Sequence, residues 1–193
     1  MDIKTKNLSV FDLLFYFIKK TIHLQKKCLL KNPFSGILIY INKQKMYSTI
    51  NAFSKLGEEL IELSQNWETS LYTHQLNKAL SHNPWFTKES VQMAIAAYGN
   101  ELHEDKITCW LSNYAITAPV SAKTIGLVMA GNIPLVGFHD LLCVLVAGHR
   151  VVAKLSSKDQ VLYEIIKDIL VRINPLFEAR ITFTDSMLKI LMQ

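Results

Sequence analysis

Cysteine is scarce in this chain, and the few cysteines form no recognisable motif. Cys28, Cys109 and Cys143 are the only three among 193 residues. They include no CxxC pair and have no histidines at metal-ligand spacing. Such a scattered, odd set is typical of free thiols in a reducing compartment. No metal site is therefore expected, and the expected location is cytoplasmic.

Glycine-rich phosphate-binding motifs are missing as well. Neither GxGxxG nor GxxxxGK[ST] follows any apolar run, so the usual fingerprints of dinucleotide and triphosphate binding are absent. Glycine and proline are modest, at seven and five residues, while 50% of the residues are hydrophobic. This composition is globular and long enough for one good core.

Long apolar runs and an evenly spread positive charge are also lacking. The run at residues 8–18 is interrupted by Asp12, is shorter than the ~20 residues that cross a bilayer, and lacks a signal-peptide cleavage site. Residues 1–45 hold nine lysines and two aspartates, a balance of +7, which leaves −2 for residues 46–193. That later part has no basic stripe for phosphates, so nucleic acid is not an expected partner.

The basic residues 1–45 are interpreted as an N-terminal extension outside the working domain. Within it, GILIYI at residues 36–41 is expected to be no more than a short strand, and NKQK at residues 42–45 a break. The alternative is a basic amphipathic segment that rests on an anionic membrane surface.

Residues 46–118 predict a helical lead-in that supplies scaffold. One apolar face has helical spacing: Ile50, Phe53, Leu56, Leu60, Leu63 and Trp67. Further helices are expected over residues 68–80, over residues 88–102 with Thr87 as the cap (or, less favoured, Ser90), and over residues 105–114. The tryptophans Trp67, Trp85 and Trp110 are expected to be packing anchors.

Residues 119–193 predict an α/β fold, the first half of a Rossmann-like, doubly wound parallel sheet. Strands are expected at residues 124–131, 149–155 and 179–185, with helices over residues 133–147 and 156–173. Pro134 suits a first helical turn and Gly148 a helix stop, and Ser156 or Ser157 suits an N-cap.

The polar residues of interest follow the expected strands, where ligands bind in such sheets. Asn132 either caps the next helix or points its amide at a developing oxyanion. Lys154 either meets a ligand phosphate or ribose, or extends to solvent at the sheet edge. Cys143 is expected to be a small buried hydrophobe without a neighbouring base, and His139 and Asp140 point to different helix faces.

The stretch AGNIPLVGFHDLLCVLVAGHRVVAKLSSKDQ resembles the acyl-CoA reductases related to the fatty-acid reductase of bacterial bioluminescence, in the aldehyde dehydrogenase superfamily. The resemblance runs from about Met46 to Lys189 and includes NAFSKLGEEL, NPWFTKESV and INPLFEARITFTDSML. It implies an aldehyde dehydrogenase-like sheet that reduces a fatty acyl-CoA to an aldehyde with NADPH or NADH. In that family the acyl group is held as a thioester on a cysteine.

The resemblance also implies roles for particular residues. Asn132 matches the asparagine of the superfamily's Pro-Trp-Asn segment, whose amide steadies the oxyanion, although Ala130-Gly131 precedes it here. Lys154 matches the lysine of a Lys-Pro-Ser-Glu segment that holds the adenosine ribose, with Ser156 and Ser157 nearby. Leu155 replaces the proline of that segment, which leaves the choice between NADPH and NADH open.

The family's catalytic cysteine, general base and later glycine-rich turn belong to its second half, which the resemblance does not reach. None of the three cysteines matches the nucleophile. The chain is therefore expected to be the N-terminal portion of such a reductase, with a truncated sheet and no turnover of acyl-CoA by itself. The alternative is a non-catalytic module that keeps only the nucleotide half-site, or an assembly module that works with a second chain. Assembly into a homo-oligomer stays open.

Overall fold

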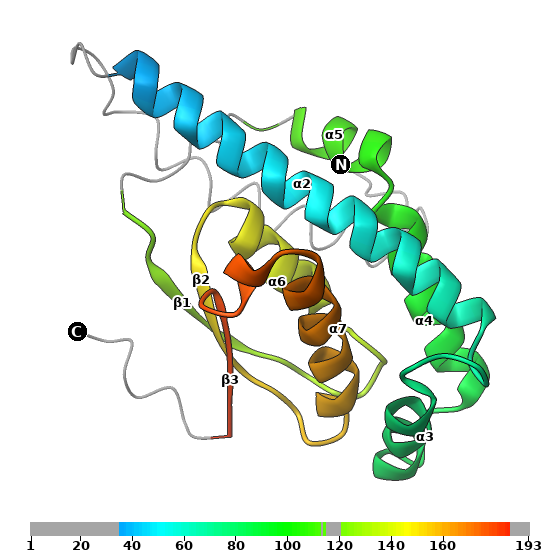
Figure 1. The fold of residues 1–193 in the computed structure, drawn as a ribbon. Coiled ribbons are helices and arrows are strands. Elements are labelled where there is room, and N and C mark those ends of the chain that lie inside the picture. Colours follow the sequence, from blue (N-terminus) through cyan, green and yellow to red (C-terminus); the bar gives the residue numbers. More distant parts are fainter. Residues whose placement is uncertain (1–34, 113, 115–120, 186–193) are drawn as a thin grey trace, which may run out of the picture. The chain divides into compact units, whose positions relative to one another are not determined.

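A computed structural model describes residues 35–112, 114 and 121–185, with side chains from Met46 on (Figure 1). The predictions for residues 1–34, including contact with a membrane surface, lie outside the described residues. From residue 37 on, the described helices and strands belong to one compact unit.

Four helices precede the sheet: α2 (Ser35–Gln65), α3 (Thr73–His82), α4 (Lys88–Glu101) and α5 (Glu104–Ser112). The predicted apolar face of α2 is confirmed, because each of its members from Ile50 to Leu63 is buried. Trp67 lies just beyond the helix and is also buried, and its Nε1 donates to Asn77 Oδ1 at 3.1 Å.

Three predictions for this half are wrong. Residues 36–41 are helical rather than extended, and the expected break at residues 42–45 lies inside α2. Lysine and glutamine are good helix formers, and no proline or glycine stops the helix between residues 37 and 45. The helix expected over residues 68–80 begins only at Thr73, because residues 67–72 form turns in which the Thr73 hydroxyl bonds to the Trp67 carbonyl.

The cap of α4 is confirmed. The Thr87 hydroxyl accepts from the Ser90 N–H at 3.1 Å, and the Ser90 hydroxyl accepts from the Thr87 N–H at 3.0 Å. Ser90 therefore completes a capping box rather than acting as the alternative cap.

The second half is an α/β unit with an open, parallel three-stranded sheet, as the sequence predicts. Strands β1 (Thr124–Val128), β2 (Arg150–Lys154) and β3 (Ile181–Thr184) lie in the order β1-β2-β3. Helix α6 (Phe138–Val146) connects β1 to β2, and α7 (Gln160–Ile173) with the 3-10 turn η1 (Pro175–Phe177) connects β2 to β3.

Helices α6 and α7 lie between the sheet and α2 (Figure 1). Alternate strand residues Val151, Ala153 and Ile181 are buried, as expected on the helix-covered face. Helix α7 is apolar around more than half of its circumference because it is covered from two sides. Its buried residues are Val161, Leu162, Tyr163, Ile165, Ile166, Ile169 and Leu170.

The predicted stop at Gly148 is confirmed. Gly148 has a φ of 84°, a left-handed conformation that glycine adopts without steric cost. Its N–H donates to the Leu145 carbonyl at 3.1 Å, and the His149 N–H donates to the Val144 carbonyl at 3.1 Å. This pair of bonds is a Schellman motif, which returns the chain sharply to β2.

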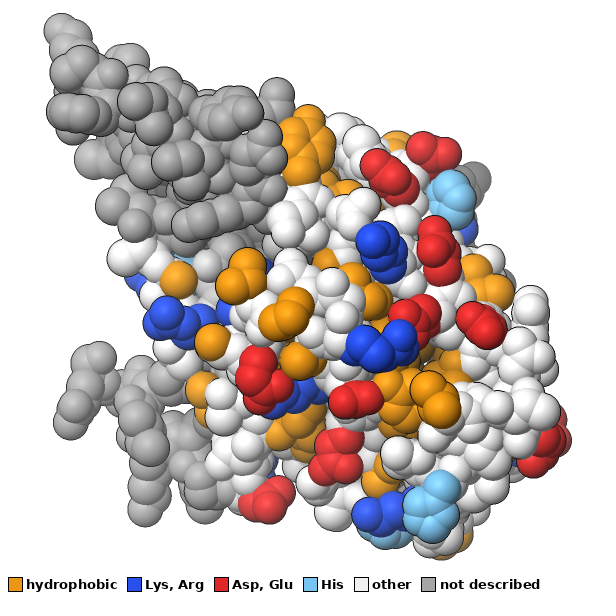
Figure 2. All heavy atoms as spheres, viewed as in Figure 1, with side chains coloured by type: hydrophobic (Ala, Val, Ile, Leu, Met, Phe, Trp, Pro, Cys, Tyr) orange, Lys and Arg blue, Asp and Glu red, His pale blue; other side chains and the backbone are white. Residues whose placement is uncertain are grey.

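The outer surface carries charges of both signs. Figure 2 shows acidic and basic side chains interspersed over the α2 and α7 side of the described chain. They include the ion pairs Arg172–Glu59, between α7 and α2, and Lys167–Glu178 at 2.8 Å. Among the described helices, none combines the length and the apolar character required to cross a membrane.

Candidate functional site

The carboxyl ends of the three strands meet in register. Val128 of β1 is paired with Lys154 of β2, and Lys154 is paired with Thr184 of β3. The ladder continues one step further, because the Met129 N–H donates to the Lys154 carbonyl at 3.0 Å. The connections that follow β1 and β2 therefore start side by side, as the sequence predicts for a parallel sheet.

Gly131 and Ser156 join these two connections in direct contact. A Cβ atom added at Gly131 would lie only 2.4 Å from Ser156 Oγ and 2.5 Å from Ser156 Cβ. Only a residue without a side chain fits there. This contact brings Asn132, the next residue, to the same edge of the sheet as Ser156.

Asn132 does not cap the following helix, so that interpretation is wrong. Residues 132–137 form a series of bends and turns, and α6 begins only at Phe138 with Gly137 as its N-cap residue. Pro134 consequently lies in this loop and not in the first turn of a helix. The Asn132 side chain is exposed and makes no hydrogen bond within the described part of the chain.

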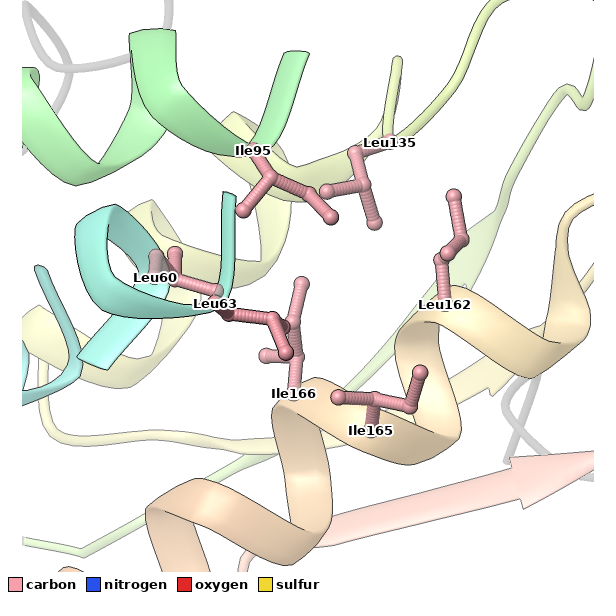
Figure 3. Close-up of a pocket in the computed structure, with 7 residues that line it drawn as sticks. All are labelled: Leu60, Leu63, Ile95, Leu135, Leu162, Ile165 and Ile166. Carbon is pink, nitrogen blue, oxygen red and sulfur yellow. The ribbon is translucent and has the colours of Figure 1, made fainter. Parts of the chain in front are cut away.

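Leu135 anchors this loop in the hydrophobic core. Its φ of 59° is unusual for a residue with a side chain and carries a steric cost. The side chain compensates by burial, and it points between α4 and α7 toward Ile95 and Leu162 (Figure 3). The gap among these residues, about 10 Å³ and lined only by apolar side chains, is a packing defect and not a ligand pocket.

Three side chains bind the backbone of the same loop: Asp159 and Tyr163, which are buried, and Tyr98, which is half-buried. Asp159 Oδ2 accepts from the Leu135 N–H at 2.8 Å, and the Tyr98 hydroxyl donates to the Leu135 carbonyl at 3.1 Å. The Tyr163 hydroxyl accepts from the Gly137 N–H at 2.9 Å. Burial raises the pKa of the Asp159 carboxyl to about 7 and that of the Tyr98 hydroxyl to about 12.

The Asn-Pro-Trp turn before α4 holds the start of the loop. Asn83 is buried, and its Nδ2 donates to the Gly131 carbonyl at 3.2 Å while its Oδ1 accepts from the Trp85 N–H at 3.1 Å. The prediction that Trp85 is a packing anchor is wrong, since the side chain is 75% exposed. The Lys158 ammonium lies 5.3 Å from the centre of its ring.

Lys154 and the two serines lie at the end of β2. Lys154 is half-buried, and strand alternation places it on the opposite face of the sheet from Ala153, away from α6 and α7. Its ammonium has no hydrogen-bond or ion-pair partner among the described residues. Neither serine caps α7, which starts at Gln160 after Asp159. The Ser156 hydroxyl instead accepts from the Lys158 N–H at 3.3 Å.

Cys143 has a neighbouring base after all. His139, one helical turn earlier on α6, places its Nε2 3.4 Å from Cys143 Sγ. The pair is not activated, because burial raises the pKa of the thiol to about 12 and lowers the pKa of the imidazole. Cys109 is exposed on α5. Within the described ranges, no cluster of three or more histidine, cysteine or acidic side chains could hold a metal ion.

Sequence reasoning missed the residues that hold the loop. Tyr163 lies in the first turn of α7 and Asp159 directly precedes the helix, four residues earlier. A polar residue at this spacing from a tyrosine on an apolar helix face is a usable signal. Asn83 and Tyr98 act over long sequence separations and carry no such signal. Comparisons with protein-family models, with curated proteins and with solved structures found no match to this chain.

Proposed function

We propose that this chain binds NADPH or NADH at the carboxyl edge of its sheet and belongs to an acyl-CoA reductase of the aldehyde dehydrogenase type. One observation carries the proposal. The loop of residues 131–137 is held by buried contacts on several sides, yet it leaves the polar side chain of Asn132 exposed at the edge where parallel sheets bind ligands.

The residues at this edge suit such a cofactor. Lys154 offers a cation and three hydrogen-bond donors without a described partner, which fits ribose hydroxyls or a phosphate. Ser156 and Ser157 add hydroxyl groups beside it. Trp85, with Lys158 over its ring, adds an exposed aromatic surface and a second positive charge. The bound nicotinamide would supply a hydride.

Asn132 would act on the acyl group. Its amide N–H₂ would donate to the oxygen of a fatty acyl carbonyl as negative charge develops there, and removal of a donor of this kind costs about 3 kcal/mol in other enzymes. The firm attachment of the loop would keep the amide oriented without reorganisation. Burial raises the pKa of the Cys143 thiol, and neither Cys143 nor Cys109 matches the nucleophile of the family that the chain resembles, so we assign the nucleophile to neither of them.

Calorimetric titration of the full chain with NADPH, and with NADH in parallel, tests the proposal. Lys154→Met should weaken binding by about tenfold, the loss expected for a hydrogen bond from a charged group. Lys123→Met is the matched control, since it removes the same charge from an exposed residue before β1, at the opposite end of the sheet. Absence of binding, or equal losses in both variants, would refute the site.

A nucleotide-binding or assembly module without catalysis is the second candidate. It is favoured by the raised pKa of the Cys143 thiol. Incubation of the chain alone with a long-chain acyl-CoA and NADPH tests for catalysis. NADPH binding without aldehyde formation agrees with a chain that needs a second component, and aldehyde formation would exclude the module.

A further inference from the structure

Asp159 is the most deeply buried carboxyl group in contact with the 131–137 loop. The residue is only 2% exposed. One carboxyl oxygen, Oδ2, accepts from the Leu135 N–H, whereas the other, Oδ1, has no hydrogen-bond partner among the described residues. A buried carboxyl with one unsatisfied oxygen is costly to ionise.

The position of Asp159 indicates that its side chain serves the 131–137 loop rather than helix α7. It directly precedes α7, where an aspartate commonly caps the helix, but its side chain makes no capping bond to α7. The side chain bonds instead to a loop 24 residues earlier in the sequence. Its partner there is Leu135. Among the described residues other than glycine, only Leu135 has a positive φ.

We propose that Asp159 is a proton-sensitive positioning residue that sets how firmly the 131–137 loop, and with it Asn132, is held. The carboxylate form makes the stronger, charge-assisted bond to the Leu135 N–H, but it also puts a charge into an apolar site in which Oδ1 has no partner among the described residues. The second effect is larger, because burial is the main cause of the raised pKa, so ionisation weakens the hold on the loop and protonation restores it. The Tyr98 and Tyr163 contacts remain, so the loop loosens at Leu135 without detaching.

The transition falls in the neutral range. Burial raises the pKa of Asp159 from its ordinary 3.8 to about 7, against the opposing effect of the Leu135 hydrogen bond. The other titratable groups nearby are Tyr98 on α4, Tyr163 on α7, and His139 and Asp140 on α6. Burial moves both tyrosine pKa values far above neutral pH. It raises the pKa of Asp140 and lowers that of His139, so these two need a control.

Nuclear magnetic resonance of the isotope-labelled full chain tests the inference without any ligand. Between pH 5 and pH 9 the Leu135 amide proton should move downfield with a midpoint near 7. Its exchange protection, corrected for intrinsic rates, should fall by about fivefold over the same range, because the buried charge favours local opening of the loop. Asp159→Asn, which keeps an acceptor oxygen but cannot ionise, should abolish the transition, and Asp140→Asn should retain it.

The carboxyl carbon resonance of Asp159 in the unmodified chain gives an independent reading if the variant does not fold. A midpoint near 4 would overturn the inference, as would a Leu135 transition that persists in Asp159→Asn or disappears in Asp140→Asn. Because no cofactor or substrate enters these measurements, their failure is distinguishable from failure of the proposed nucleotide site.

Discussion

Gly131 leaves room for Ser156, because it has no side chain. Gly131→Ala would put a Cβ within 2.5 Å of two atoms of Ser156, so one of the two connections must move. We expect a loss of about 1–3 kcal/mol in the free energy of unfolding, the usual cost of overpacking, measured by urea denaturation. The double variant with Ser156→Gly removes both atoms and should recover part of the loss. Without any recovery, the contact with Ser156 would not be the cause.

Ser156 also shows how one residue can resemble a motif and act differently. Its position after β2 predicts a helix cap, yet its hydroxyl stays within its own turn and its Cβ packs on Gly131. Its part in holding the two connections together is therefore steric, whatever its hydroxyl binds.

At the scale of elements, the capping box of α4 stabilises the helix next to the Asn83 turn. Thr87→Ala removes an acceptor for the Ser90 N–H and should lower the free energy of unfolding by about 1 kcal/mol. Thr87→Ser keeps the hydroxyl and serves as the control. A circular-dichroism urea titration measures both, and equal losses in the two variants would contradict the role of the cap.

Elements with strong periodicity were predictable from the sequence. The buried face of α2 and the alternation of strands and helices after Lys123 follow from spacing alone, and Thr87 and Gly148 mark real helix ends. The start of α6 was not predictable in the same way. Pro134 suits a first helical turn, but long-range bonds to Leu135 and Gly137 favour a loop there instead.

The candidate site was predictable only in outline. Asn132, Lys154 and the serines were expected at the ends of adjacent strands, and the register of β1 and β2 places their connections side by side. Their support was not visible, because Asn83 reaches the loop from the turn before α4 and Tyr98 from α4, and both are 37 or more residues away in sequence. The spacing of apolar residues also did not predict that the Trp85 side chain faces solvent.

At the scale of the whole molecule, Asp159 should make stability depend on pH. Its folded pKa, about 7, exceeds the ordinary 3.8, so between about pH 4 and pH 7 the folded chain holds a proton that the unfolded chain has released. Its contribution to the free energy of unfolding therefore falls as pH rises through this window. Each pKa unit corresponds to about 1.4 kcal/mol, so the difference between the two pKa values corresponds to about 4 kcal/mol.

Comparison with Asp159→Asn isolates this contribution from all other titrating groups. Urea unfolding at pH 4, 5, 6, 7 and 8 should show the variant gaining on the unmodified chain as pH rises, with little further change above pH 8. A difference in unfolding free energy that stays constant across the series would mean that folding does not change the pKa of Asp159.

Leu135 connects the exposed carboxyl edge of the sheet to the hydrophobic core. Its side chain lies among Ile95 and Leu162, so any change of volume there shifts the backbone that carries Asn132. If the proposed site binds its ligand at this edge, a change of apolar residues in this part of the core would also alter ligand recognition. A homologue with a repacked interior at these positions should then be examined for altered specificity, even when every polar residue at the edge is unchanged.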